Sequence, residues 1–430
     1  MTIPEALAAV IIPAGSPILT PLNAGEVQIS IEANKFTDIS NNANIKSNIF
    51  IWKFLRSPYE NKNILTLLKH QANQIKISDD NLFRNINLRL NKIHRCNKIN
   101  KGNQKFNCDH HIYDQNLIFS FIGKENETEI VNSLLNNYTD SGNKLHSDWG
   151  IWTSGTIAYG RTDNTNSIKG GKISVNDLSI GIDKFHSGSY LNGFLIHKSF
   201  AKNSLENSNS WIKTKSETIG SYHSLMIKKD QFFDLSFMYS NVDIDYNRPA
   251  SNNSHYYRGI RNGVSIQSNL VYSLNIPINK FNLTPSGEVR YGLIKLDNFN
   301  ESAGVETLAF SDQHTRTSSF KFSIDVDHEE IIHKKIVVKP FGSLGYEKNF
   351  TQDYEIKSYY ATNPLGIYST KIDKDFSKIL DGKIGIDVSY PSGFLGSFIF
   401  VRRDYSDYAH INEIKLSFSI PSHKLLRVLD

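Results

Sequence analysis

One stretch, Phe281 to Gly304 (FNLTPSGEVRYGLIKLDNFNESAG), constrains most strongly what this chain can fold into. Between Leu283 and Leu293, apolar or small residues alternate with polar ones, namely Thr284, Ser286, Glu288 and Arg290. Alternation with a period of two predicts a β-strand that has one apolar and one polar face. The carboxylate and guanidinium on the polar face suit a hydrated interior better than a packed core. Strands of soluble proteins usually have about five or six residues, whereas this strand continues for about ten or more, as a tilted transmembrane strand does.

The chain from residue 149 to residue 420 divides into strands of this kind. We predict twelve of them, at residues 149–160, 172–185, 190–200, 213–227, 232–244, 259–274, 281–295, 317–326, 336–346, 378–390, 394–403 and 412–420. Short and long connections alternate between these strands without exception. Such alternation is typical of short periplasmic turns and long external loops, and a soluble antiparallel protein has no reason to show it. The predicted fold is therefore an all-β, twelve-stranded antiparallel transmembrane β-barrel.

Composition is consistent with this fold and excludes several other classes. Hydrophobic residues make up 39% of the chain, and no apolar run approaches the roughly 18 residues of a membrane-spanning helix. The lack of such a run does not exclude a barrel, because alternate residues of its strands face a polar lumen. The net charge of +5 comes from dispersed Lys and Arg. The densest basic patch, Arg84 to Lys105, has no stacking aromatics apart from Phe83 and Phe106, so we expect no nucleic-acid partner.

Residues 149–420 resemble the translocator β-barrel of classical (type V) autotransporters. The segment PSGEVRY followed by the loop NFNESAG carries the resemblance, as do WGIWTSGTIAYGR, SIGIDKF, LNGFLIHKSF, SETIGSYHSLMI and VVKPFGSLGYEKNF. The resemblance implies a Gram-negative outer-membrane protein that carries its own N-terminal passenger to the cell surface and anchors it there. It also implies the outer-membrane lipid and the barrel-assembly machinery as partners, no cofactor and no enzymatic activity. The chain itself offers no nucleophile elbow and no phosphate-binding glycine loop.

The last predicted strand resembles the assembly signal of this family. Its lipid-facing positions include Ile414, Leu416, Phe418 and Ile420. Glu413 and Lys415 alternate with these and are expected to face the lumen, as are Glu288 and Arg290 of the first stretch. The family usually ends on an aromatic residue, whereas this chain continues with PSHKLLRVLD. That departure is consistent with weaker recognition by the assembly machinery or with a frameshifted end.

The resemblance also implies a helix that threads the pore ahead of the first strand. Helical periodicity occurs in an apolar cluster of Ile64, Leu65, Leu67 and Leu68, in Asn81 to Arg95 and in Glu127 to Tyr138. The last two segments are the candidates for the pore helix, and we favour Glu127 to Tyr138 because it lies closer to Trp149. We therefore divide the chain into a remnant of an extracellular β passenger (1–40), a linker with helices that include the pore helix (41–148), the barrel (149–421) and a tail (422–430). The beginning, MTIPEALAAVIIPAGSPILT, has no basic n-region and no clean cleavage site, so we expect a truncated or mis-started chain.

Two cysteines, Cys96 and Cys108, leave three alternatives open. They could form a disulfide in an oxidising compartment, remain free thiols, or bind a metal with the nearby His94, His110 and His111. Their spacing matches no standard zinc pattern, so we expect no metal. Functional alternatives also stay open. The barrel could only anchor a surface adhesin, it could be a passive pore, or the chain could be a soluble β-enzyme.

Overall fold

The structure is a computed structural model that describes most of residues 25–96 and most of residues 149–421, with short gaps. The chain divides into two compact units, residues 1–61 and residues 62–430. In the first unit, β1 (Gly25–Ile29) pairs antiparallel with β2 (Phe50–Phe54), and a short 3-10 helix, η1 (Pro58–Glu60), follows. The predicted boundary after residue 40 therefore falls inside a β-hairpin.

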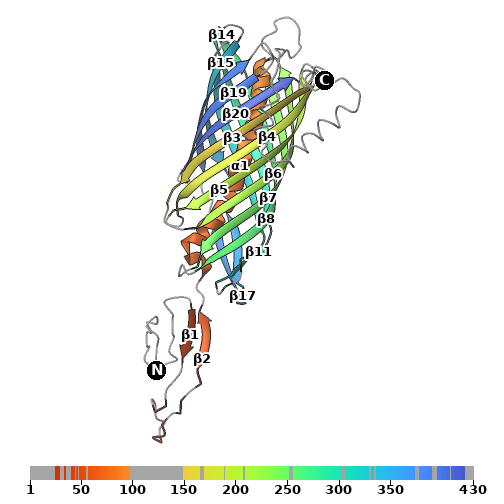
Figure 1. The fold of residues 1–430 in the computed structure, drawn as a ribbon. Helices are drawn as coiled ribbons and strands as arrows, with labels where there is room; N and C mark the ends of the chain where they lie inside the picture. Colours follow the sequence, from red (N-terminus) through yellow and green to blue (C-terminus); the bar gives the residue numbers. More distant parts are fainter. Residues whose placement is uncertain are drawn as a thin grey trace, which may run out of the picture. The chain divides into compact units, whose positions relative to one another are not determined.

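The second unit is a closed antiparallel β-barrel with one helix inside it (Figure 1). Its twelve strands are β3 (Trp149–Thr162), β4 (Gly171–Ser187), β5 (Tyr190–Leu205), β6 (Trp211–Lys228), β7 (Gln231–Pro249), β8 (Tyr256–Leu274), β10 (Phe281–Leu296), β13 (Gln313–His328), β15 (Ile336–Asn349), β18 (Lys378–Ser389), β19 (Leu395–Tyr405) and β20 (Ala409–Pro421). Strand β20 pairs with β3 from Ala409 opposite Thr162 to Pro421 opposite Gly150, which closes the barrel. The predicted fold class and strand number are confirmed.

The two faces of the wall follow the alternation seen in the sequence. Large apolar side chains point outward and are exposed, among them Ile157, Phe194, Ile219, Phe237, Ile266, Phe322, Leu344, Ile384 and Phe398. Small hydroxyl side chains point inward and are buried, among them Ser154, Thr156, Ser179, Ser199, Ser216, Ser236, Ser265 and Ser319. An apolar outside and a polar inside are what a barrel in a lipid bilayer requires.

Two of the long connections, which were expected to be loops, together form a second sheet that we call the loop sheet. Strands β11 (Phe299–Asn300), β12 (Leu308–Phe310), β16 (Tyr354–Tyr360) and β17 (Asn363–Ile372) pair in that order. Two short strands, β9 (Ile276–Ile278) and β14 (Ile331–His333), extend the turns at the other end of the barrel. Burial raises the pKa of the Tyr360 phenol in the loop sheet, because the charged phenolate would be poorly solvated there.

Helix α1 (Lys62–Cys96) runs through the interior of the barrel (Figure 1). Its 35 residues include no Gly or Pro, and at about 1.5 Å per residue they span about 52 Å. None of the helices among the described residues combines the length and apolarity that a membrane crossing requires. The sequence-based preference for Glu127 to Tyr138 as the pore helix is corrected here. The lumenal helix contains the other candidate, Asn81 to Arg95, and Glu127 to Tyr138 lies outside the described residues.

Candidate functional site

The two ends of α1 are bound to opposite ends of the barrel. Near its N-terminus, Thr66 Oγ1 accepts a hydrogen bond of 3.0 Å from the backbone N–H of Lys169, which lies in the long connection between β3 and β4. One turn later, His70 Nδ1 lies 2.7 Å from the hydroxyl of Tyr408, between β19 and β20. The helix therefore begins at the end of the barrel that carries the long connections.

The C-terminal part of α1 is bound to the end that carries the short turns. Arg89 donates two hydrogen bonds of 2.8 Å to the two carboxylate oxygens of Asp183, a residue of β4 that is fully buried. The Tyr222 hydroxyl donates to the same carboxylate over 2.9 Å, and Trp152 Nε1 donates to the Tyr222 hydroxyl over 2.7 Å. Five residues further along the helix, the ring of His94 stacks on the ring of Phe232 in β7, with 3.8 Å between the ring centroids. The bidentate pair between Arg89 and Asp183 fixes the orientation of the helix as well as its position.

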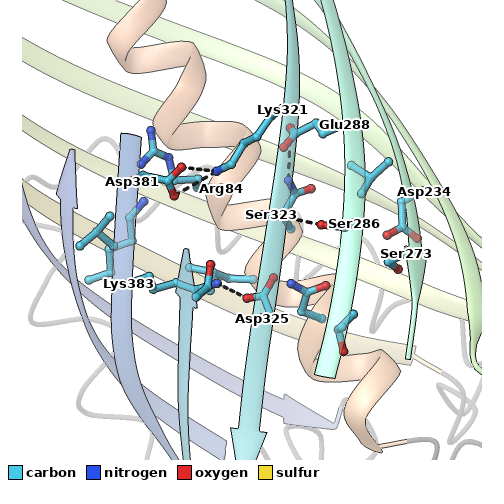
Figure 2. Close-up of a pocket in the computed structure, with 18 residues that line it drawn as sticks. Arg84, Asp234, Ser273, Ser286, Glu288, Lys321, Ser323, Asp325, Asp381 and Lys383 are labelled. Atoms are coloured by element: carbon cyan, nitrogen blue, oxygen red, sulfur yellow. Dashed lines mark hydrogen bonds and ion pairs between the residues drawn. The ribbon is translucent and has the colours of Figure 1, made fainter. Parts of the chain in front are cut away.

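The helix does not fill the lumen evenly. It packs closest to the wall formed by β3 to β8. On the opposite side a cavity remains beside α1, lined mainly by strands β10, β13, β15 and β18 (Figure 2). Two ion pairs cross this wall, Lys321 with Asp381 at 2.7 Å and Lys383 with Asp325 at 2.7 Å. The cavity is therefore lined by charges that are already paired.

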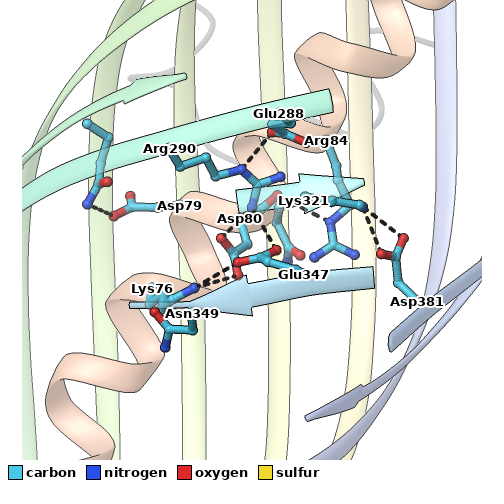
Figure 3. Close-up of polar contacts among 12 residues, drawn as sticks. Lys76, Asp79, Asp80, Arg84, Glu288, Arg290, Lys321, Glu347, Asn349 and Asp381 are labelled. Atoms are coloured by element: carbon cyan, nitrogen blue, oxygen red, sulfur yellow. Dashed lines mark hydrogen bonds and ion pairs between the residues drawn. The ribbon is translucent and has the colours of Figure 1, made fainter. Parts of the chain in front are cut away.

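A charged network joins α1 to strands β10 and β15 of the wall (Figure 3). Arg290 of β10 donates to Asp80 of α1 at 2.8 Å and to Glu288 of its own strand at 2.6 Å. Lys76 of α1 donates to Glu347 of β15 at 3.3 Å. All five side chains are buried. Charges buried in this way are tolerated because each one has a partner of opposite sign.

A second network joins α1 to the last strands. Glu413 of β20 forms an ion pair with Arg403 of β19 and lies 3.7 Å from Arg84 of α1. Lys415 of β20 donates to Asn85 of α1 over 3.1 Å. The structure thus places all four residues expected in the lumen, Glu288, Arg290, Glu413 and Lys415, inside the barrel and in two networks that hold the helix.

The remaining sequence-based candidates lie elsewhere. Ile414, Leu416 and Phe418 lie on the outward face of β20, opposite in parity to the buried Glu413 and Lys415, and Ile420 belongs to the same strand. Their role in assembly stays a prediction. Cys96 ends α1, whereas Cys108 lies outside the described residues, so the disulfide also stays a prediction. Among the described residues no group of three His, Cys, Asp or Glu side chains could hold a metal ion.

Sequence reasoning missed the partners that α1 uses. Asp183 lies within the SIGIDKF segment, where period-two alternation assigns it to the polar face, so the pattern could have identified it. Asp80 and Arg89 carried no comparable signal, because their partners in the wall, Arg290 and Asp183, are 210 and 94 residues away in the sequence and the contacts depend on how the helix is rotated.

A closed twelve-stranded barrel with an apolar outer face, a polar lumen and an ion-paired helix inside it defines the class of outer-membrane translocator barrels. The sequence profile described as "Autotransporter beta-domain" matches residues 151–392, more than half of the chain, and the chain belongs to this family. The barrel is thus an outer-membrane domain of the kind used for secretion and anchoring.

One solved structure supports the fold of the barrel, and a second shows a weaker likeness. The translocator domain of the autotransporter NalP from Neisseria meningitidis is similar with a TM-score of 0.53 and 16% identity, covering 68% of this chain and 95% of that one. The β-domain of the Bordetella autotransporter BrkA matches with a TM-score of 0.44 and 15% identity, covering 64% of this chain and 99% of that one. No curated protein matches the sequence.

Proposed function

We propose that this barrel carries the chain segment that precedes α1 to the cell surface and then anchors it there. One observation supports the proposal most directly. Helix α1 begins at the long-connection end, where Thr66 contacts Lys169, and it ends at the short-turn end, where Arg89 contacts Asp183. In an outer-membrane barrel the long connections face the outside. The chain before Lys62 would therefore leave the barrel on the cell surface.

The networks in the lumen suggest how anchoring would work. The helix is bound to the wall at both ends and between them, and the carboxylates that bind it are buried. Removing one member of a buried pair leaves a charge without compensation, which is strongly unfavourable. Withdrawal of the helix would break several such pairs at once. The helix would therefore act as a tether that resists extraction of the surface segment.

The test uses the full chain with a known signal peptide and an epitope placed before Met1. Intact cells are treated with protease, and the outer membrane is then examined for a heat-modifiable barrel. We expect the epitope to disappear while the barrel remains. A second epitope in the short turn at Lys229 and Asp230 is the control, because it should be protected in intact cells and lost after permeabilisation. An inserted barrel with a protected N-terminal epitope would contradict the proposal.

A surface adhesin that uses the barrel only as an anchor is the second candidate. The loop sheet favours it, since Leu365 and Ile367 of β17 are exposed by 93% and 66%. Replacing residues 354–372 by a short Gly-Ser connection should abolish cell attachment and leave export of the epitope unchanged if this reading is correct. Loss of export without loss of attachment would contradict it.

A further inference from the structure

The outward face of the barrel carries a cluster of cations near the long-connection end of β3 to β6. We call it the basic rim, and it consists of Arg161, Lys172, Lys202 and Lys213, all of them exposed. The register places Arg161 directly opposite Lys172 and Lys202 directly opposite Lys213. Like charges directly opposite each other on neighbouring strands are destabilising. Two such pairs side by side therefore suggest that an anion binds between them.

The two pairs form one continuous row. Lys172 of β4 is opposite Ser204 of β5, and Lys202 of β5 is opposite Ser174 of β4. Lys172 and Lys202 are thus diagonal neighbours, at a separation of roughly 7–8 Å that long side chains can bridge. A phosphate group between them could be contacted by both ammonium groups, and a second phosphate could be contacted along the same row.

The carboxylates near the basic rim do not bind its three lysines. Glu206 pairs with Arg161 at 2.7 Å, and Asp245, which is opposite Lys213, pairs instead with Arg258 at 2.7 Å. Glu217 is shared by two lysines of the same sector, at 2.8 and 3.5 Å. Among the described residues no carboxylate pairs with Lys172, Lys202 or Lys213. The positive charge of these three lysines is therefore not neutralised by a carboxylate of the described residues.

The apolar side chains beside the rim indicate what kind of anion would bind there. Tyr159 and Phe200 precede Arg161 and Lys202 by two positions on the same strands, so they point outward next to them, and they are exposed by 51% and 50%. On β6 the outward face becomes apolar at Ile219, which is 62% exposed. The rim thus lies where the lipid-facing surface gives way to charge. Clusters of Lys and Arg at such a boundary bind anionic lipid headgroups.

We propose that the basic rim is a binding site for the phosphate groups of a phosphorylated glycolipid of the outer leaflet, with its acyl chains on the apolar surface below. The phosphate groups would compensate the positive charge of the lysines, and the acyl chains would cover the exposed aromatic side chains beside them. The site belongs to the wall of the barrel and not to the lumen. It depends on the barrel lying in the outer membrane with its long connections outside, and not on transport of the N-terminal segment.

The test compares two variants that remove the same charge from different walls. K172S/K202S/K213S removes three cations of the rim, and K295S/R316S/K348S removes three outward-facing cations from β10, β13 and β15, of which Lys295 and Arg316 are exposed and Lys348 is half-buried. Affinity of the refolded full chain for bis-phosphorylated lipid A is measured in phosphatidylcholine nanodiscs. We expect the rim variant to bind roughly a hundredfold more weakly, because each lysine near a membrane surface contributes about fivefold. The control variant should change affinity by less than about fivefold.

Further measurements separate the sources of the phosphate and exclude misfolding. Lipid A without phosphate should bind the wild type as weakly as intact lipid A binds the rim variant. K172R/K202R/K213R should retain binding, and heat modification should show that every variant forms the barrel. Equal losses in the rim and control variants would overturn the proposal. So would binding of inorganic phosphate to the wild type as tight as that of the lipid.

Discussion

Asp183 is a carboxylate with no exposed surface inside a membrane barrel, and Arg89 neutralises it through two hydrogen bonds of equal length. The Tyr222 hydroxyl adds a third hydrogen bond but no charge. Removing Arg89 would therefore leave an anion in an environment that cannot solvate it. Losing one partner of a buried ion pair costs about 3–5 kcal/mol, whereas exposed pairs contribute little. The buried pair is thus expected to stabilise the fold, and exposed pairs of the same geometry are not.

We expect Arg89→Ala to lower the free energy of unfolding of the refolded barrel by about 3–5 kcal/mol. The measurement is the urea dependence of heat modification in detergent. Arg258→Ala is a matched control, because Arg258 forms a bidentate pair with Asp245 at 2.7 and 2.8 Å on the exposed outer face. That variant should unfold nearly as the wild type does. Equal effects of the two substitutions would show that burial of Asp183 is not what makes its pair important.

At the same scale, alternation alone assigned Glu288, Arg290, Glu413 and Lys415 to the lumen, because neighbours on a strand face opposite sides. It could not identify what they bind. Asp80 meets Arg290 over a sequence separation of 210 residues, and Asn85 meets Lys415 over 330. Such contacts depend on strand register, barrel closure and the rotation of α1, none of which is encoded locally.

Among the elements, the strands were predictable and the lumenal helix was only partly so. Each strand has its own apolar face, so its limits followed from the sequence to within a few residues, the largest differences being at β5 and β7, which each continue about five residues further into the long connections. Helix α1 lies in a polar lumen, so the apolar residues of its N-terminal half, such as Leu68 and Ile75, alternate with polar residues that are also buried. Lys76, Asp79 and Asp80 are buried against polar partners. In the sequence alone, such charged residues indicate a segment that is exposed to solvent.

The position of α1 predicts how the lumen conducts ions. Deleting residues 1–61 leaves the helix in place and should leave conductance in planar bilayers low, limited to the cavity beside β10 to β18. Deleting residues 1–96 removes the helix, and we expect conductance to rise several-fold because the polar lumen is then open along its length. Both proteins carry the same signal peptide and are checked for heat modification. Equal conductance of the two deletions would mean that α1 does not obstruct the lumen.

For the whole molecule, the unequal lengths of the connections define a direction. The long connections and the loop sheet gather at the end where α1 begins, and the short turns gather where it ends. The barrel fold was evident from the sequence for the same reason, since the alternation of short and long connections extends along the whole barrel, whereas the resemblance to the family rested on short motifs such as PSGEVRY and NFNESAG. The loop sheet was not evident, because its strands pair across two connections that are polar and separated by β13 and β15.

This direction can be measured without reference to transport. In a background with Cys96 and Cys108 replaced by Ser, a single cysteine is placed either at Leu365, in the loop sheet, or at Lys229, in a short turn; both positions are exposed. A membrane-impermeant maleimide should label Leu365→Cys in intact cells and should label Lys229→Cys only after the outer membrane is permeabilised. Both cysteines are equally accessible in detergent, so any difference in cells reports the side of the membrane. The opposite pattern would place the start of α1 in the periplasm. Residues 1–61 could then not reach the cell surface through this barrel, and both the transport proposal and the outer-leaflet site at the basic rim would fail together.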